Sequence, residues 1–133
     1  MRNLALIFLI TLSVSANSQK SENYSDLNQL STPEESWLEL LRNLKIGSSD
    51  SIKAVVTENG FECLIKYISP YNESDPFTVS FRNWGNMWSN WDTEWGEIKD
   101  NRVKLKVGQE SKDHVFTFLK IGTEWKMEYW DPY

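Results

Sequence analysis

The chain contains a single histidine, His114, and histidine is the side chain that most readily exchanges a proton near neutral pH. Asp113 precedes it, and a carboxylate can orient an imidazole for acid–base chemistry. Neighbouring residues of a strand point to opposite faces, however, so adjacency alone does not bring these two side chains together. The pattern favours a structural histidine, and a small-molecule lyase or isomerase that uses His114 is kept as an alternative function.

The other reactive groups form no recognisable site. Cys63 is the only cysteine, which excludes a disulfide within the chain, and we expect it to be buried and inert. Residues 90–94 (NWDTE) look like the first half of a calcium-binding loop. Trp95 then stands where such a loop requires glycine, and Asn101 stands where it requires a bidentate glutamate. We therefore expect neither a metal site nor a cofactor.

Tryptophan is unusually frequent, with seven residues in a chain of 133. Six large apolar residues are spaced by 3, 4, 3, 4 and 3 positions: Phe81, Trp84, Trp88, Trp91, Trp95 and Ile98. This spacing places all six on one face of a helix, although many residues between them are poor helix formers. The pattern predicts a helix over 81–98, with an irregular aromatic-rich loop as the alternative.

An aromatic stripe of this kind is typically the side of a helix that packs into a core. Four tryptophans are more than a small core needs, and an indole offers an apolar face and a hydrogen-bonding edge to a flat ligand. The candidate ligand-binding residues are therefore Trp84, Trp88, Trp91, Trp95, Asn90 and Asp92. A sugar or glycan face or an aromatic small molecule is the expected ligand. A protein partner is the alternative, because tryptophan is enriched in interface hot spots.

Charge and composition exclude several classes of function. The chain has 14 Lys and Arg against 19 Asp and Glu, a net charge of −5, and 40% of its residues are hydrophobic. An acidic chain lacks the basic surface that nucleic-acid phosphates require, so no nucleic-acid partner is expected. The length and composition correspond to one globular domain.

The N-terminus has the three parts of a secretory signal peptide. A basic start precedes an apolar run of 11 residues from Leu4 to Val14, and small and polar residues follow. Eleven residues are too few to cross a membrane, which takes about 20. We expect cleavage after Ala16 or Ser18, removal of residues 1–18, and no integral membrane segment afterwards. The expected location is secreted or periplasmic.

The next residues divide into a leader and a capped helix. Residues 19–31 are polar and without period, which predicts a flexible leader before a single domain over 32–133. Thr32 begins a capping box with a proline at the first helical position, leucines follow at helical spacing, and Gly47 is a typical stop. These signals predict a helix over 33–46.

The middle of the chain carries weaker signals. Residues 48–50 offer a second helix cap, followed by a short apolar face that Asn59-Gly60 would end. Residues 61–68 fit both a helix and a strand, and we favour the helix. Residues 69–76 are rich in Pro, Asn, Ser and Asp, which predicts a loop.

The last third changes to the two-residue period of strands. We predict strands over 102–107, 114–121 and 125–129, with a tight turn around Gly122 between the last two. The middle strand is apolar on both faces over most of its length, which predicts an inner strand covered on each side. Trp125 lies on the apolar face of the last strand and is expected in the core. Helices first and an antiparallel meander last define an α+β fold, with N-terminal helices packed on a C-terminal sheet.

The order of elements and the pattern F-x-F-L-K-x-G-x-x-W-K-M-x-Y-W over 116–130 resemble small exported proteins of the nuclear-transport-factor-two-like superfamily. The resembling residues are Phe116, Phe118, Leu119, Lys120, Gly122, Trp125, Lys126, Met127 and Tyr129. The resemblance implies a cystatin-like α+β cone, in which a curved sheet wraps a long helix and leaves a pocket between them. Some members are dehydratases or isomerases that depend on His and Asp residues in the pocket, and many bind ligands. No catalytic residue is carried over, because His114 matches no catalytic position of the family.

The expected function is therefore non-catalytic binding of a ligand through a Trp-lined groove. A lyase or isomerase that uses His114 is one alternative, and an inhibitor or envelope accessory that binds a protein partner is another. Geometry separates them: an enclosed pocket containing His114 favours the enzyme, an exposed row of tryptophans favours the ligand binder, and a flat apolar patch favours the partner.

Overall fold

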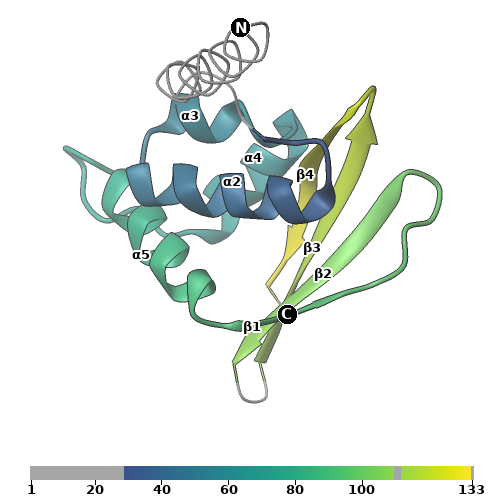
Figure 1. Cartoon of the computed structure of the whole chain (residues 1–133). Helices are drawn as coiled ribbons and strands as arrows, with labels where there is room; N and C mark the ends of the chain where they lie inside the picture. The colour runs from purple at the N-terminus through teal and green to yellow at the C-terminus, as the bar shows by residue number, and fades with distance from the viewer. Residues whose placement is uncertain (1–28, 110–111, 133) are drawn as a thin grey trace, which may run out of the picture.

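A computed structural model describes residues 29–109 and 112–132, so the predicted signal peptide and most of the predicted leader lie outside the described residues. The helices come first: α2 (Pro33–Ile46), α3 (Ser49–Lys53), α4 (Glu58–Tyr67) and α5 (Thr78–Ser89). The strands follow: β1 (Asp92–Trp95), β2 (Arg102–Gln109), β3 (Lys112–Ile121) and β4 (Glu124–Asp131). The strands form one antiparallel sheet in the order β1-β2-β3-β4, and the helices lie together on one side of it (Figure 1). The predicted α+β class is confirmed.

Helix α2 has the predicted bounds because its end signals are local. The hydroxyl of Thr32 accepts a hydrogen bond from the backbone N–H of Glu35 at 3.1 Å. Gly47 ends the helix with φ of 86°, a left-handed conformation that other residues rarely adopt. Its buried apolar face consists of Trp37, Leu40, Leu41 and Leu44.

The fold begins earlier than the predicted domain boundary at Thr32. Leu30 is buried, and its backbone carbonyl accepts a hydrogen bond from the backbone N–H of Trp125 at 2.7 Å. The last residues of the predicted leader over 19–31 therefore contribute to the core.

Helix α4 confirms the helix favoured for 61–68, but it begins earlier. Thr57 caps it by accepting a hydrogen bond from the backbone N–H of Gly60 at 3.0 Å. Asn59-Gly60 thus lies in the first turn of α4. The prediction that this pair ends a helix is wrong. Glycine fits here because a Cβ at position 60 would run into the backbone carbonyl of Met127.

The predicted helix over 81–98 is wrong beyond Ser89. The chain turns at residues 90–91 and then forms β1, which pairs with β2 in a register that joins Asp92 to Gly108 and Trp95 to Leu105. The segment after Ser89 is poor in helix formers, and pairing with the edge of β2 gives its backbone the hydrogen bonds that a helix would have provided.

The aromatic residues of the tryptophan pattern nevertheless pack in or against one hydrophobic core. Phe81 and Trp88 are buried on α5, and Trp84, Trp91 and Trp95 are partly buried against the same cluster. The spacing of aromatic residues predicts burial correctly, although it does not predict one continuous helix.

Strand β3 is an inner strand, as predicted, but only one of its faces is fully buried. His114, Phe116 and Phe118 point to the helices, whereas Val115 and Leu119, which alternate with them, are half-buried on the other face. The expectation of a cover on each side is therefore wrong for the described residues. The tight turn to β4 is confirmed, with φ of 63° at Gly122.

Strand β4 contains a β-bulge. Its register with β3 shifts between Thr117 and Phe118, so Glu128 is an extra residue without a partner in the ladder. Regular alternation places residues five positions apart on opposite faces. Because of the bulge, Trp125 and Trp130 are both buried, with 5% and 1% of their surface exposed. The predicted core position of Trp125 is confirmed, and Trp130 joins it.

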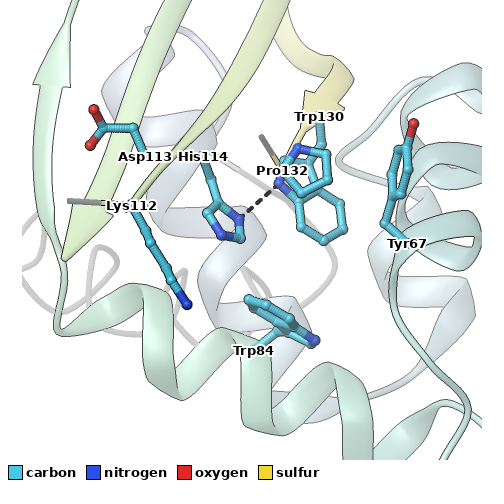
Figure 2. Close-up of a pocket in the computed structure, with 7 residues that line it drawn as sticks. All are labelled: Tyr67, Trp84, Lys112, Asp113, His114, Trp130 and Pro132. Atoms are coloured by element: carbon cyan, nitrogen blue, oxygen red, sulfur yellow. Dashed lines mark hydrogen bonds between the residues drawn. The ribbon is translucent and has the colours of Figure 1, made fainter. Parts of the chain in front are cut away.

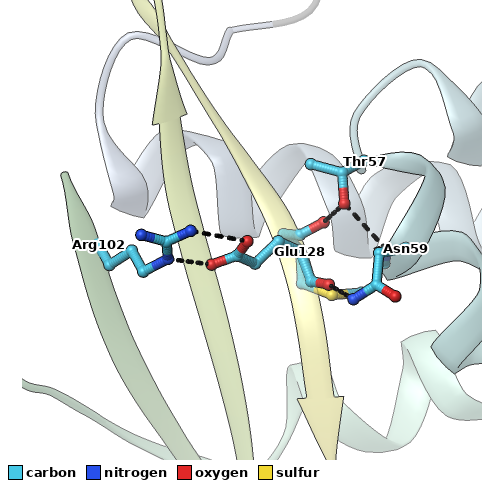
Figure 3. A network of polar contacts seen from close by, with 6 residues as sticks. Thr57, Asn59, Arg102 and Glu128 are labelled. Atoms are coloured by element: carbon cyan, nitrogen blue, oxygen red, sulfur yellow. Dashed lines mark hydrogen bonds and ion pairs between the residues drawn. The ribbon is translucent and has the colours of Figure 1, made fainter.

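Polar contacts hold the bulge in place (Figure 3). The backbone N–H of Thr57 donates to the carbonyl of Met127 at 3.0 Å, and the side-chain amide of Asn59 donates to the carbonyl of Glu128 at 2.7 Å. The carboxylate of Glu128 forms an ion pair with Arg102 of β2, with 2.6 Å between Nε and Oε2. The start of α4 is thereby tied to the irregular part of β4.

Candidate functional site

His114 and Trp130 lie side by side on the helix-facing side of the sheet, near the ends of β3 and β4 (Figure 2). The indole N–H of Trp130 donates a hydrogen bond to Nδ1 of His114 at 3.1 Å, and both residues are buried. The two rings are stacked, with centroids 5.7 Å apart and planes 20° apart. An indole N–H only donates, so Nδ1 accepts, and the proton of the neutral imidazole lies on Nε2.

Tryptophans of α5 and the following turn surround the imidazole. The ring centroids of Trp84, Trp88 and Trp91 lie 5.5, 6.1 and 5.3 Å from that of His114. The Nε2 atom of His114 has no hydrogen-bond partner among the described residues. In Figure 2 it faces the side of the pocket where Lys112 and Trp84 lie.

Burial lowers the pKa of His114 below its ordinary value, because apolar rings replace the water that would stabilise the charged imidazolium. The negative charge of Asp113 opposes this effect, and the positive charge of Lys112 adds to it. His114 is therefore a neutral hydrogen-bond donor near neutral pH.

A pocket of about 450 Å³ opens beside the imidazole. Its lining residues are Tyr67, Trp84, Lys112, Asp113, His114, Trp130 and Pro132. Tyr67 at the end of α4 and Trp84 on α5 both meet the ring of Trp130 edge-on, with centroid distances of 5.7 Å and interplanar angles of 80° and 66°. Helices and sheet together thus build an aromatic corner with an imidazole at its side.

Strand alternation decides which polar groups enter this pocket. Lys112 and His114 are two residues apart, so their side chains project to the same side of β3. Figure 2 shows the side chain of Lys112 extending in the direction of Trp84, whereas the carboxylate of Asp113 points away. The expectation that Asp113 and His114 do not meet by adjacency is confirmed.

The structure divides the four predicted tryptophans between two places. Trp84 is half-buried and lines the His114 pocket, whereas Trp91 and Trp95 line a second groove of about 300 Å³ beside Trp37 of α2. Trp88 also lines the second groove, although only 1% of its surface is exposed, and its indole N–H has no hydrogen-bond partner in the described parts of the chain.

The two predicted polar residues lie outside the His114 pocket. The side-chain amide of Asn90 donates to the backbone carbonyl of Asn86 at 3.0 Å, at the end of α5. Asp92 is exposed at the start of β1. The sequence pattern places both beside tryptophans on one continuous helix, whereas α5 ends at Ser89, before either of them.

Sequence reasoning missed four residues of the pocket: Tyr67, Lys112, Trp130 and Pro132. Lys112 could have been predicted from the sequence, since its two-residue spacing from His114 places both side chains on one face of a strand. Regular alternation from Trp125 would place Trp130 on the opposite face, so the bulge prevented its prediction. Tyr67 comes from a helix that no local signal links to β4.

Comparison with protein-family models, with curated proteins and with solved structures finds no match for this chain. Within residues 29–109 and 112–132, no group of three or more His, Cys, Asp and Glu side chains is arranged to hold a metal ion. No helix in the same ranges is both long and apolar enough to cross a membrane.

Proposed function

We propose that this protein binds a small molecule with a flat apolar face in the pocket beside His114. The half-buried ring of Trp84, which lines a pocket of about 450 Å³, is the observation that carries this proposal. The volume lies within the usual range of ligand pockets, about 300–1,000 Å³. Aromatic walls with a few polar groups are typical of such sites, because stacking contributes affinity and hydrogen bonds fix orientation.

A lyase or isomerase that uses His114 is the second candidate, since the imidazole borders the pocket. The hydrogen bond from Trp130 argues against His114 as a catalytic base. Its Nδ1 atom already accepts the indole N–H of Trp130, and its Nε2 atom already carries a proton. The one carboxylate among the lining residues, Asp113, points away (Figure 2). The pocket is thus equipped to donate a hydrogen bond to a ligand, and none of its described lining residues is placed as a base to abstract a proton.

A concave pocket also suits a small molecule better than a protein partner, which requires a larger contact area. The predicted signal peptide supports a secreted or periplasmic site of action. The resemblance to the nuclear-transport-factor-two-like superfamily implies a pocket between helix and sheet, and membership of that family stays a prediction.

The test uses neutral indole as the probe and the backbone and indole N–H signals of ¹⁵N-labelled protein as the readout. We expect indole to shift the signals of Trp84 and Trp130. Trp84→Ala is expected to weaken binding about tenfold, the size of one stacking contact. Trp95→Ala, which alters the second groove, is the matched control and is expected to leave the affinity unchanged. Shifts confined to Trp91 and Trp95, or no shifts at all, would overturn the proposal.

A further inference from the structure

Two neighbouring polar groups on one side of the aromatic pocket are hydrogen-bond donors: the ammonium group of Lys112 and the Nε2–H of His114. We infer that the pocket selects an aromatic carboxylate, whose ring lies against Trp84 and Trp130 and whose carboxylate oxygens accept from Lys112 and His114. This inference rests on the binding function proposed above and names the class of its ligand.

The positive charge of Lys112 is available to a ligand. The described residues place no acidic partner within ion-pair distance of it, although the chain has more acidic than basic residues. Lys112 lies two residues before His114 on the same face of β3, and both line the same pocket. Figure 2 shows both on the same side of the pocket, with the ring of Trp84 below them.

The charge pattern argues against other ligands. An aromatic corner by itself suits a quaternary ammonium group. Here Lys112 would repel a cation, and the carboxylate of Asp113 points away from the space where a cation would lie. One ammonium group and one neutral N–H match the single charge of a carboxylate, whose two oxygens accept two donors at once.

Three probes with the same ring and different charge test this inference: 2-naphthylacetate, 2-naphthylacetamide and 2-(2-naphthyl)ethylamine. Their affinities are measured by titration calorimetry, and their position is checked by the indole N–H signals of Trp84 and Trp130. We expect the acetate to bind about tenfold more tightly than the amide, which corresponds to one charge-assisted hydrogen bond. The amine should bind most weakly.

The variants Lys112→Met and Lys112→Gln are both expected to reduce the preference for the acetate over the amide to about twofold or less. Lys120→Met is the matched control, because it removes the same charge from an exposed position at the other end of β3. It should retain the full preference.

The possible failures are distinguishable. Equal affinity for acetate and amide, or a preference that survives both Lys112 variants, would overturn the carboxylate inference and leave the binding function standing. Tighter binding of the amine would overturn it in favour of a cation site. If none of the three probes shifts the signals of Trp84 and Trp130, the binding function fails together with the inference.

Discussion

The indole N–H of Trp130 and the Nδ1 atom of His114 share a buried hydrogen bond of 3.1 Å across the β3–β4 pair. It fixes the tautomer of the imidazole and the orientation of two pocket walls at once. It also forms only while Nδ1 is unprotonated, so protonation of His114 would remove the acceptor. The bond therefore links the geometry of the pocket to pH.

Stability should decline below the ordinary pKa of histidine. The pKa of His114 is lowered in the folded state from its ordinary value of 6.5. Above that value both states are neutral and pH has no effect through this residue. As the pH falls below it, the unfolded chain takes up a proton that the folded chain does not, so the free energy of unfolding decreases.

This effect is measured by urea unfolding at about pH 7.5 and pH 5.5, on either side of the ordinary value. His114→Gln is the comparison, because the glutamine carbonyl can still accept from Trp130 and does not titrate. We expect the wild-type protein to lose more stability than the variant over this interval. An equal loss in both would show that His114 does not carry the effect.

Trp125→Ala should destabilise the protein by about 3–5 kcal/mol, as for other buried aromatic residues. Its side chain is 5% exposed, and its backbone N–H bonds to Leu30. Tyr129→Ala, on the same strand with 43% of Tyr129 exposed, is the control and should have a much smaller effect. Denaturant midpoints provide the measurement, and a loss below about 1 kcal/mol for Trp125→Ala would contradict its core position.

Gly60→Ala should also destabilise the protein, although alanine usually stabilises a helix relative to glycine by up to about 1 kcal/mol. The added Cβ would meet the carbonyl of Met127 and push α4 away from β4. We expect a loss of about 1–3 kcal/mol, typical of overpacking. Gly96→Ala is the control, since its Cβ would find the nearest atom at 3.4 Å. A thermal unfolding midpoint that rises in Gly60→Ala would disprove the close approach.

Export should remove the apolar start of the chain. The expected mature protein begins at Asn17 or Gln19, after cleavage at one of the two small-residue sites. Sequencing of the N-terminus of exported protein distinguishes the two. A mature product that retains residues 4–14 would rule out the signal peptide.

Helix α2 and strands β2, β3 and β4 could be predicted because their signals are local. The cap at Thr32, the stop at Gly47 and the alternation in β2 each depend on a few neighbouring residues. Local signals gave a wrong prediction where a contact between residues distant in sequence determines the structure. Asn59-Gly60 has the composition of a turn, but the approach of β4 makes glycine necessary inside a helix.

The candidate site could be predicted only in part. His114 and Trp84 were among the selected residues because their types stand out in the sequence. Tyr67 and Trp130 complete the pocket only after α4 and β4 come together, and Trp130 faces inward only because of an irregularity that period-two reasoning does not contain. Asn90 and Asp92 were wrongly assigned to the site because the predicted helix continued through them, whereas the chain leaves α5 at Ser89 and forms the edge strand β1.

The extra residue at Glu128 also determines how β4 would respond to a change in length. In a regular strand, deletion of one residue turns everything beyond it to the opposite face. In β4, deletion of Glu128 would restore regular alternation and leave the indole of Trp130 directed at His114. A one-residue insertion at the same point would also restore regular alternation and keep Trp130 on the inner face, but it would move Trp130 two positions along β3, from opposite Phe116 to opposite His114. The side chain of Trp130 thus stays on the inner face after either change, whereas its position along β3 is preserved only when the strand is shortened.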